Sequence, residues 1–384
     1  MSTWKPLTRL PSPIELVRQF TPNWFTVNMG TGIVFLLLAQ FPAPIAGLHA
    51  LAYWLFVADA LIFAMFAGLF AARWVLFTRD ALPLLRHPVQ SMFLGALPMA
   101  LIPLVNGLVL FHPGSALATQ WAQHLWWIDA ALSLATGWLV PWYQFTAQDH
   151  SLERMTGVWL LPVVPAEVAA SSAGFLAQHL PAAQAQSLVV AGYALWGVSV
   201  PIAMGILTVL YLRLALHKLP ARELGVSTWL SLGPIGTGAF ALLTLGAAAP
   251  QAFAGTVMAP VAALAGPLGI VGALVLWGLG LWWLVTAAAL TGIQIRRGLP
   301  FNLGWWGFTF PLGVYAAASL TLGLRTQIPF FTAFAAMLIV ALLGAWVVVA
   351  ARSAHGLWHG HLVYAPCLNC ACTGESRPGL NAAT

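Results

Sequence analysis

Residues 88–112 read PVQSMFLGALPMALIPLVNGLVLFH, and no charged side chain interrupts these 25 residues. Residues 119–145, TQWAQHLWWIDAALSLATGWLVPWYQF, follow after a short connection and contain a single charged residue, Asp129. A hydrocarbon core about 30 Å thick is crossed by roughly 20 helical residues, because each residue adds 1.5 Å. Both stretches are long enough to cross a bilayer, and together they predict a membrane-spanning helical hairpin.

The composition extends this interpretation to the whole chain. Of 384 residues, only 15 are Lys or Arg and 9 are Asp or Glu, which is 6% charged, while 60% are hydrophobic. The mean hydropathy is +0.87. An ordinary soluble protein carries about 25% charged residues. The composition excludes a soluble enzyme, a disordered chain and a nucleic-acid binder. Apolar runs this long are typical of helices rather than of alternating barrel strands, so we expect an all-α polytopic membrane protein with the lipid bilayer as its partner.

The sequence predicts ten spans and two tails. The tails are residues 1–20 and 355–384, and residues 21–354 form the membrane domain. Fourteen of the 15 Lys and Arg residues fall on one side of this map, and Arg325 alone falls on the other. By the positive-inside rule, both termini are expected in the cytoplasm, in an inner (plasma) membrane protein. The predicted spans are 22–41, 49–77, 88–112, 119–145, 157–179, 185–213, 227–248, 260–293, 303–325 and 329–354.

The spans repeat as pairs. The odd-numbered helices begin near residues 22, 88, 157, 227 and 303, at intervals of 66 to 76 residues. This period indicates five helical hairpins. Most odd helices carry Gly and Pro in mid-span, which suits backbone that lines a protein-enclosed or water-filled path. We therefore expect an inner ring of odd helices around a central pore. The alternative is that Gly and Pro are simply frequent in membrane helices.

The sequence offers few motifs for nucleotide, cofactor or metal sites. There is no phosphate-binding G-x-x-x-x-G-K-[ST] sequence, and we expect no cofactor and no resident metal. A membrane-embedded redox or enzyme subunit is the alternative function, and His124 with Asp129 comes nearest to a ligand set for it. A cytoplasmic zinc site in the tail is a second open alternative. Its ligands would come from His355, His359, His361, Cys367, Cys370 and Cys372.

Five motifs, each on an odd helix, carry a family resemblance. They are TPNWFTVNMGTG (21–32), HPVQSMFLGALPM (87–99), WLLPVVP (159–165), LGPIGTG (232–238) and WWGFTFPLG (305–313). Together they resemble the tellurite-resistance/dicarboxylate transporter family. That family includes slow-type anion channels, yeast malic-acid transporters and sulfite efflux pumps. The segments are most similar to the malate and sulfite branch.

The resemblance implies a gradient-driven transporter or channel for small anions: a C4-dicarboxylate such as malate, sulfite or tellurite. It also implies a homotrimer with one pore in each protomer. In the family a phenylalanine on the ninth helix plugs the pore, and the matching residue here is Phe310, before Pro311. Phe308 lies about 200° around the helix, so the two rings cannot both face the lumen. Channel and proton-coupled carrier both remain open.

An anion would meet no Lys or Arg in mid-span along this path, so helix N-termini and hydroxyls would have to stabilise it. For each hydroxyl, the alternative is a bond to the preceding helical turn. The predicted path residues are Gly30, Thr31, Gly32, Ser91, Gly95, Pro98, Pro165, Ser171, Ser172, Gly236, Thr237, Thr309 and Pro311.

Three acids lie within the predicted spans. Glu167, on the fifth, is the candidate for proton coupling or pH gating, and the alternative is a structural acid. Asp59 and Asp129 lie on even helices, where we expect them to anchor helix contacts.

Overall fold

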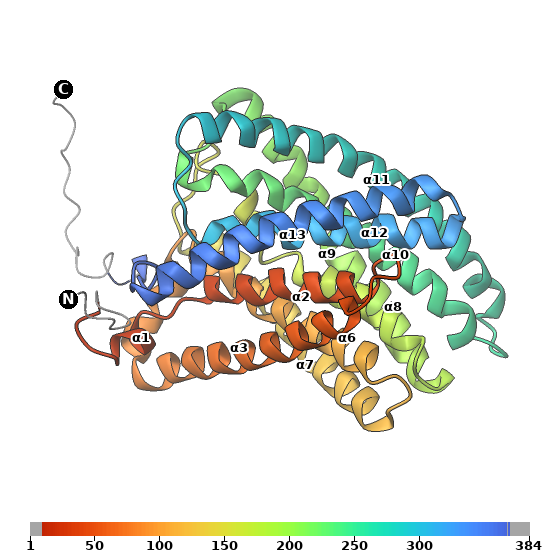
Figure 1. Cartoon of the computed structure of the whole chain (residues 1–384). Helices are drawn as coiled ribbons and strands as arrows, with labels where there is room; N and C mark the ends of the chain where they lie inside the picture. Colours follow the sequence, from red (N-terminus) through yellow and green to blue (C-terminus); the bar gives the residue numbers. More distant parts are fainter. Residues whose placement is uncertain (1–9, 367, 369–384) are drawn as a thin grey trace.

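The structure, a computed structural model, describes residues 10–366 and 368, and these residues are helical without any strand. Most of the long helices run roughly alongside one another (Figure 1). Three short helices near one end are α1 (Glu15–Arg18), α4 (Thr78–Ala81) and α5 (Pro83–Arg86). The long helices are α2 (Phe25–Ala39), α3 (Leu48–Leu76), α6 (Ala96–Phe111), α7 (Ala116–Thr146), α8 (Pro165–Ala177), α9 (Ala182–His217), α10 (Leu232–Ala252), α11 (Ala259–Arg296), α12 (Phe310–Thr326) and α13 (Pro329–Trp358).

Eight helical segments in the described chain are long and apolar enough to cross a membrane. The long helices outside this group are α7 and α8. The 31 residues of α7 are interrupted by polar side chains such as Gln120, Gln123 and Asp129, and α8 has only 13 residues. The all-helical membrane fold is thus confirmed with eight candidate spans, against the ten that the sequence predicts.

Buried and exposed helices alternate along the chain. In α2, α6, α10 and α12, 72–83% of the most apolar stretch is buried inside the molecule. In α3, α9, α11 and α13 the buried share is only 17–33%. All residues of α8 except Phe175 are buried, whereas α7 exposes large side chains such as Trp121, Trp138 and Trp142. An exposed apolar surface of this extent is suited to lipid.

The contacts between helices follow the same alternation. The buried helices touch one another in the cyclic order α2, α6, α8, α10, α12 and back to α2. Each buried helix also packs against the exposed helix that follows it in the chain, from α2 with α3 to α12 with α13. The buried helices therefore form a closed ring, with exposed helices outside it.

Each buried helix begins with a 3₁₀ segment: η1 (Pro22–Trp24), η2 (Ser91–Gly95), η3 (Gly157–Leu160), η4 (Arg222–Ser231) and η5 (Leu303–Phe308). Pro98, Pro165, Pro234 and Pro311 all lie in the first turn of the α-helix that follows. Pro98, Pro234 and Pro311 thus lie within apolar spans, where a 3₁₀ segment passes into the α-helix, and Pro103 lies inside α6 itself. A proline has no N–H to donate, so it fits the first helical turn, where that group has no intrahelical partner.

Candidate functional site

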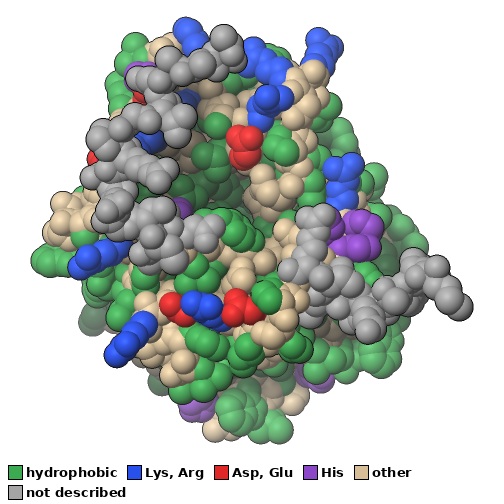
Figure 2. Space-filling model, turned by 90° about the vertical axis from the view of Figure 1, so that its left-hand side faces the viewer, with side chains coloured by type: hydrophobic (Ala, Val, Ile, Leu, Met, Phe, Trp, Pro, Cys, Tyr) green, Lys and Arg blue, Asp and Glu red, His purple; other side chains and the backbone are tan. Residues whose placement is uncertain are grey.

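A cavity of about 430 Å³ opens at the end of the molecule where the buried helices begin. All five 3₁₀ segments or their flanking residues contribute to its wall, and residues 361, 362, 364 and 366 border it as well. Figure 2 looks onto this end and shows a hollow with hydrophobic walls, with Lys and Arg side chains around it. The five helix starts thus share one open cavity.

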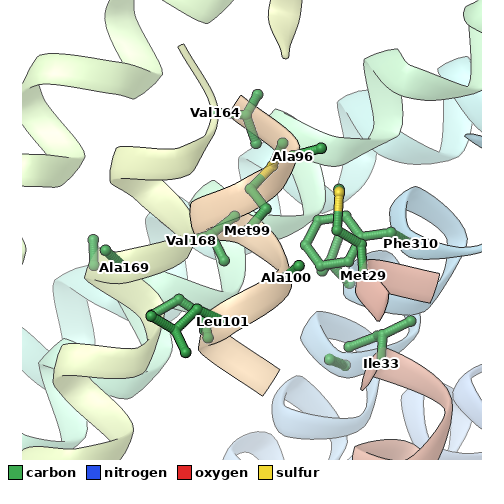
Figure 3. Close-up of a cluster of buried hydrophobic side chains, with 14 of the residues drawn as sticks. Met29, Ile33, Ala96, Met99, Ala100, Leu101, Val164, Val168, Ala169 and Phe310 are labelled. Atoms are coloured by element: carbon green, nitrogen blue, oxygen red, sulfur yellow. The ribbon is translucent and has the colours of Figure 1, made fainter. Parts of the chain in front are cut away.

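The cavity ends on apolar side chains from four elements. Its inner wall includes Met29 of α2, Met99 of α6, Val164 before α8, and Phe310 of α12. Figure 3 shows these side chains on neighbouring buried helices, with Phe310 beside Met29. Phe310 is 4% exposed. Ile33, one turn deeper than Met29, does not line the cavity, so the open space stops at the level of Phe310.

The two phenylalanines of the last motif point in different directions. Phe308 packs edge-on against Trp229 and Trp305, with ring centroids 5.5 and 5.6 Å apart. Phe310 and Pro311 line the cavity, and Phe308 does not. This agrees with the helical geometry that separates the two rings.

The predicted path glycines lie where helices approach closely. A side chain at Gly30 would collide with Thr309, at Gly32 with Pro103, and at Gly95 with the carbonyl of Leu161. A Cβ at Gly236 would lie 2.7 Å from the backbone nitrogen of Tyr315. The missing side chains of these residues face neighbouring segments, so the glycines permit the ring to close tightly. Pro98 is buried within the same ring.

Most of the predicted hydroxyls are engaged inside the protein. Thr31 accepts a hydrogen bond from Trp346 of α13 (3.1 Å), and Ser91 accepts one from Gln148 (3.0 Å). Ser171 and Thr309 bond back to carbonyls three residues earlier, at 2.8 and 2.7 Å. Thr31 and Ser91 therefore face the outer parts of the molecule, and Ser171 and Thr309 follow the alternative of bonding to the preceding turn.

Polar groups do occur deeper than Phe310. Thr237 is 1% exposed, and its hydroxyl has no hydrogen-bond partner within the described residues. It lies one turn after Gly233, which lines the cavity, and so on the same helix face. Ser172 donates to Asn106 Oδ1 at 2.6 Å. Our sequence reasoning missed Asn106, although an amide in the middle of an uncharged run of 25 residues is itself a signal.

The three buried acids have different surroundings. Asp59 accepts a hydrogen bond from Asn28 of α2 at 2.9 Å, which links α3 to the ring. Asp129 accepts one from Ser133 of its own helix at 3.3 Å. Glu167 is fully buried in the first turn of α8, and neither carboxyl oxygen has a hydrogen-bond partner in the part of the chain that the structure describes. It does not line the cavity.

Two histidines, His87 and His150, lie in connections that lead into buried helices. His87 Nδ1 accepts hydrogen bonds from the backbone N–H groups of Val89 and Gln90, at 3.2 and 3.1 Å. Partial burial lowers the pKa of His87, which keeps Nδ1 available as an acceptor. His150 contacts Gln148 Oε1 at 2.8 Å, and burial, with the nearby Arg154 charge, lowers its pKa as well.

The candidate metal ligands are only partly described. The rings of His355 and His359 lie 4.4 Å apart, and those of His359 and His361 lie 5.7 Å apart. The three tail cysteines, Cys367, Cys370 and Cys372, lie outside the described residues. Among described residues, no group of three or more His, Cys, Asp or Glu is arranged to hold a metal ion. Of the pair His124 and Asp129, both on α7, His124 is exposed and its ring contacts the carbonyl of Gln120, whereas Asp129 is fully buried.

Known proteins match this chain over most of its length. The family model for the voltage-dependent anion channel SLAC1 matches residues 19–354. A sulfite efflux pump of Trichophyton rubrum is 39% identical over 345 residues, covering 88% of this chain and 91% of the pump. The malic acid transport protein of Schizosaccharomyces pombe is 22% identical over 343 residues, covering 87% and 78%.

An uncharacterized transporter of Methanocaldococcus jannaschii is also similar, with 28% identity over 309 residues and coverage of 80% and 85%. The resemblance carried by the five motifs is thereby confirmed. The family and these relatives are transporters or channels rather than enzymes, which removes the embedded-enzyme alternative. The chain belongs to the SLAC1 family of anion channels.

Proposed function

We propose that this protein moves small anions down their gradient across a membrane, with sulfite as its first substrate. The 39% identity to the sulfite efflux pump of Trichophyton rubrum is much greater than the 22% identity to the malic acid transport protein. Malate is therefore the second candidate, and tellurite, which rests on the family resemblance alone, is the third. The observation that carries the proposal is a cavity at the starts of five ring-forming helices, whose apolar inner wall includes Phe310.

The proposed path runs through the ring of α2, α6, α8, α10 and α12, and each of these helices forms a hairpin with the helix that follows. In this arrangement all ten long helices cross the membrane. The 31 residues of α7 extend about 46 Å, and α8 together with η3 covers residues 157–177, which is enough for a span.

The proposed path offers an anion only weak attraction. No Lys or Arg occurs in α2, α6, α8 or α10, and α12 carries only Arg325, in its last turn. The positive ends of the helix dipoles point toward the entrance, and Thr237 and Asn106 lie deeper along the ring. Weak binding of this kind suits conduction, because the ion must also leave.

The proposed gate is Phe310. Phe310→Ala should raise the sulfite flux through proteoliposomes, because the cavity would then extend past the level of Met29 and Met99. The control is Phe308→Ala, which removes an equal ring from the Trp229–Trp305 cluster and leaves the cavity floor intact.

A wild-type protein that conducts neither sulfite nor malate would contradict the proposed function. An unchanged flux in a folded Phe310→Ala variant would contradict the gate alone. The test should include chloride and nitrate, with and without a pH gradient. Uphill movement driven by protons would identify a carrier, and strictly downhill current would identify a channel.

We propose that the protein lies in the inner (plasma) membrane as a homotrimer, with both termini in the cytoplasm. We also propose that Glu167 is its proton-coupling or pH-gating residue. The trimer rests on the family resemblance. Native mass spectrometry at three times the 41.0 kDa chain mass would support it, and a monomer mass would contradict it.

A further inference from the structure

We propose that the entrance cavity contains an anion-binding site built from uncharged donors, with Gln90 as its main residue and Asn23 and Ser227 as its partners. The expected ligand is a small oxyanion, held between the rim and Phe310. The inference rests on the proposed anion transport for its biological meaning, but binding can be measured without transport.

Gln90 is a buried amide that the fold leaves unused. Its side chain lines the cavity and is 8% exposed. Oε1 is enclosed without a hydrogen-bond partner, and Nε2 makes no hydrogen bond to any residue that the structure describes. Oε1 only accepts hydrogen bonds and cannot bind an anion, so the donor of this amide is Nε2. Nε2 is not enclosed as Oε1 is, and without a bond inside the protein it is available to an acceptor in the cavity. The backbone N–H of Gln90 is meanwhile fixed by His87.

Asn23 adds a donor from a second segment. It lies in η1 and lines the same cavity. The hydroxyl of Thr21 donates to Asn23 Oδ1, so the oxygen end of this amide is occupied. Nδ2 is the end that remains, and an amide nitrogen can only donate. The pairing with Thr21 thus orients Asn23 as a hydrogen-bond donor.

Ser227 adds a donor from a third segment. It lies in η4, is 6% exposed and borders the cavity. Its hydroxyl bonds to none of the described side chains or carbonyls. By contrast, Asn302 on the same wall accepts from the N–H of Gly304 and donates to the carbonyl of Glu223. Asn302 is therefore used to hold the cavity wall together, whereas the donors of Gln90, Asn23 and Ser227 are available to a ligand.

These groups suit an oxyanion that must pass onward. Each of the three neutral donors can bind an oxygen of an anion in the cavity, and none holds it as a fixed cation would. Glu223 is the acid on the cavity wall; it is exposed at the rim, where water and salt screen its charge. The site lies on the entrance side of Phe310, so it would raise the local anion concentration before the gate.

The test compares Gln90→Leu with wild type in proteoliposomes, using sulfite as the probe. Loss of a hydrogen bond to a charged ligand should raise KM for sulfite about tenfold, with little change in the maximal flux. Gln251→Leu is the matched control, because Gln251 is exposed at the far end of α10. Gln90→Leu breaks no internal side-chain bond and should fold; Ser227→Ala provides the same comparison if it does not.

A second measurement separates binding from transport. Sulfite should raise the melting temperature of the detergent-solubilised wild type, and this rise should be smaller in Gln90→Leu. A Gln90-dependent rise without any flux would contradict the proposed function but support the site. Flux with the same KM and the same rise in both proteins would overturn the site while leaving transport intact.

Discussion

Glu167 is the buried acid for which the structure gives the strongest reason to test a functional role. It is fully buried in α8, and its two carboxyl oxygens lack hydrogen-bond partners among the described residues. An ionised carboxylate placed inside the membrane without a partner costs several kcal/mol. Since Glu167 does not line the entrance cavity, it would act on the path through the packing of α8. We predict that Glu167→Gln flattens the pH dependence of anion flux.

Nitrate is the appropriate anion for this measurement, because it does not titrate between pH 5.5 and 8.5. Glu223→Gln is the control, since Glu223 is an exposed acid on the rim. If Glu167→Gln keeps the wild-type pH profile, the acid is structural and the coupling hypothesis is wrong.

The location of a single residue could be predicted from the sequence only where the residue belonged to a recognised motif. Phe310 follows from the match in its motif, and it lies at the inner end of the cavity. Thr31 and Ser91 could not be placed, because a helix that is buried on all sides has no polar face to reveal which side meets the lumen. Their hydrogen bonds to Trp346 and Gln148 depend on segments far away in sequence.

The close packing of buried helices against one another depends on individual glycines. The three atoms nearest to a Cβ at Gly236 of α10 are backbone atoms of α12, at 2.7–3.0 Å, and backbone cannot rotate away. Overpacking of this kind costs about 1–3 kcal/mol. We predict that Gly236→Ala lowers the melting temperature in detergent by several degrees and reduces flux.

Gly278→Ala is the matched control for this substitution. Gly278 lies on the exposed helix α11, and a Cβ there would meet nothing within 4 Å. The control should be as stable as wild type or slightly more so, because Ala favours helix over Gly. Equal stability of the two variants would show that the contact between α10 and α12 tolerates a methyl group.

Element positions were far more predictable than residue roles. Each of the ten predicted segments overlaps one long helix of the structure, because long apolar runs leave few alternatives. The 3₁₀ starts were not predicted. Their Pro, Gly and Trp residues fit either a mid-helix break or an entry turn, and only the tertiary contacts decide between them.

At the scale of the whole molecule, charge and cavity lie at the same end. Within the described chain, every Lys and Arg except Arg325 lies in or beside a connection that leads into a buried helix, or near the end of α13. The buried helices begin at the cavity, so these cations surround its entrance (Figure 2). Such a field steers anions toward the opening and weakens as salt increases.

The same asymmetry predicts the orientation in the membrane. With the basic end in the cytoplasm, Cys367, Cys370 and Cys372, which are all the cysteines of the chain, should be cytoplasmic. A membrane-impermeant maleimide should leave intact cells unlabelled and label the protein after permeabilisation. A cysteine-free variant carrying Ala43→Cys, in the exposed connection between α2 and α3 at the opposite end, should label in intact cells. Labelling of the native cysteines from outside would invert the topology and place the cavity on the outer face.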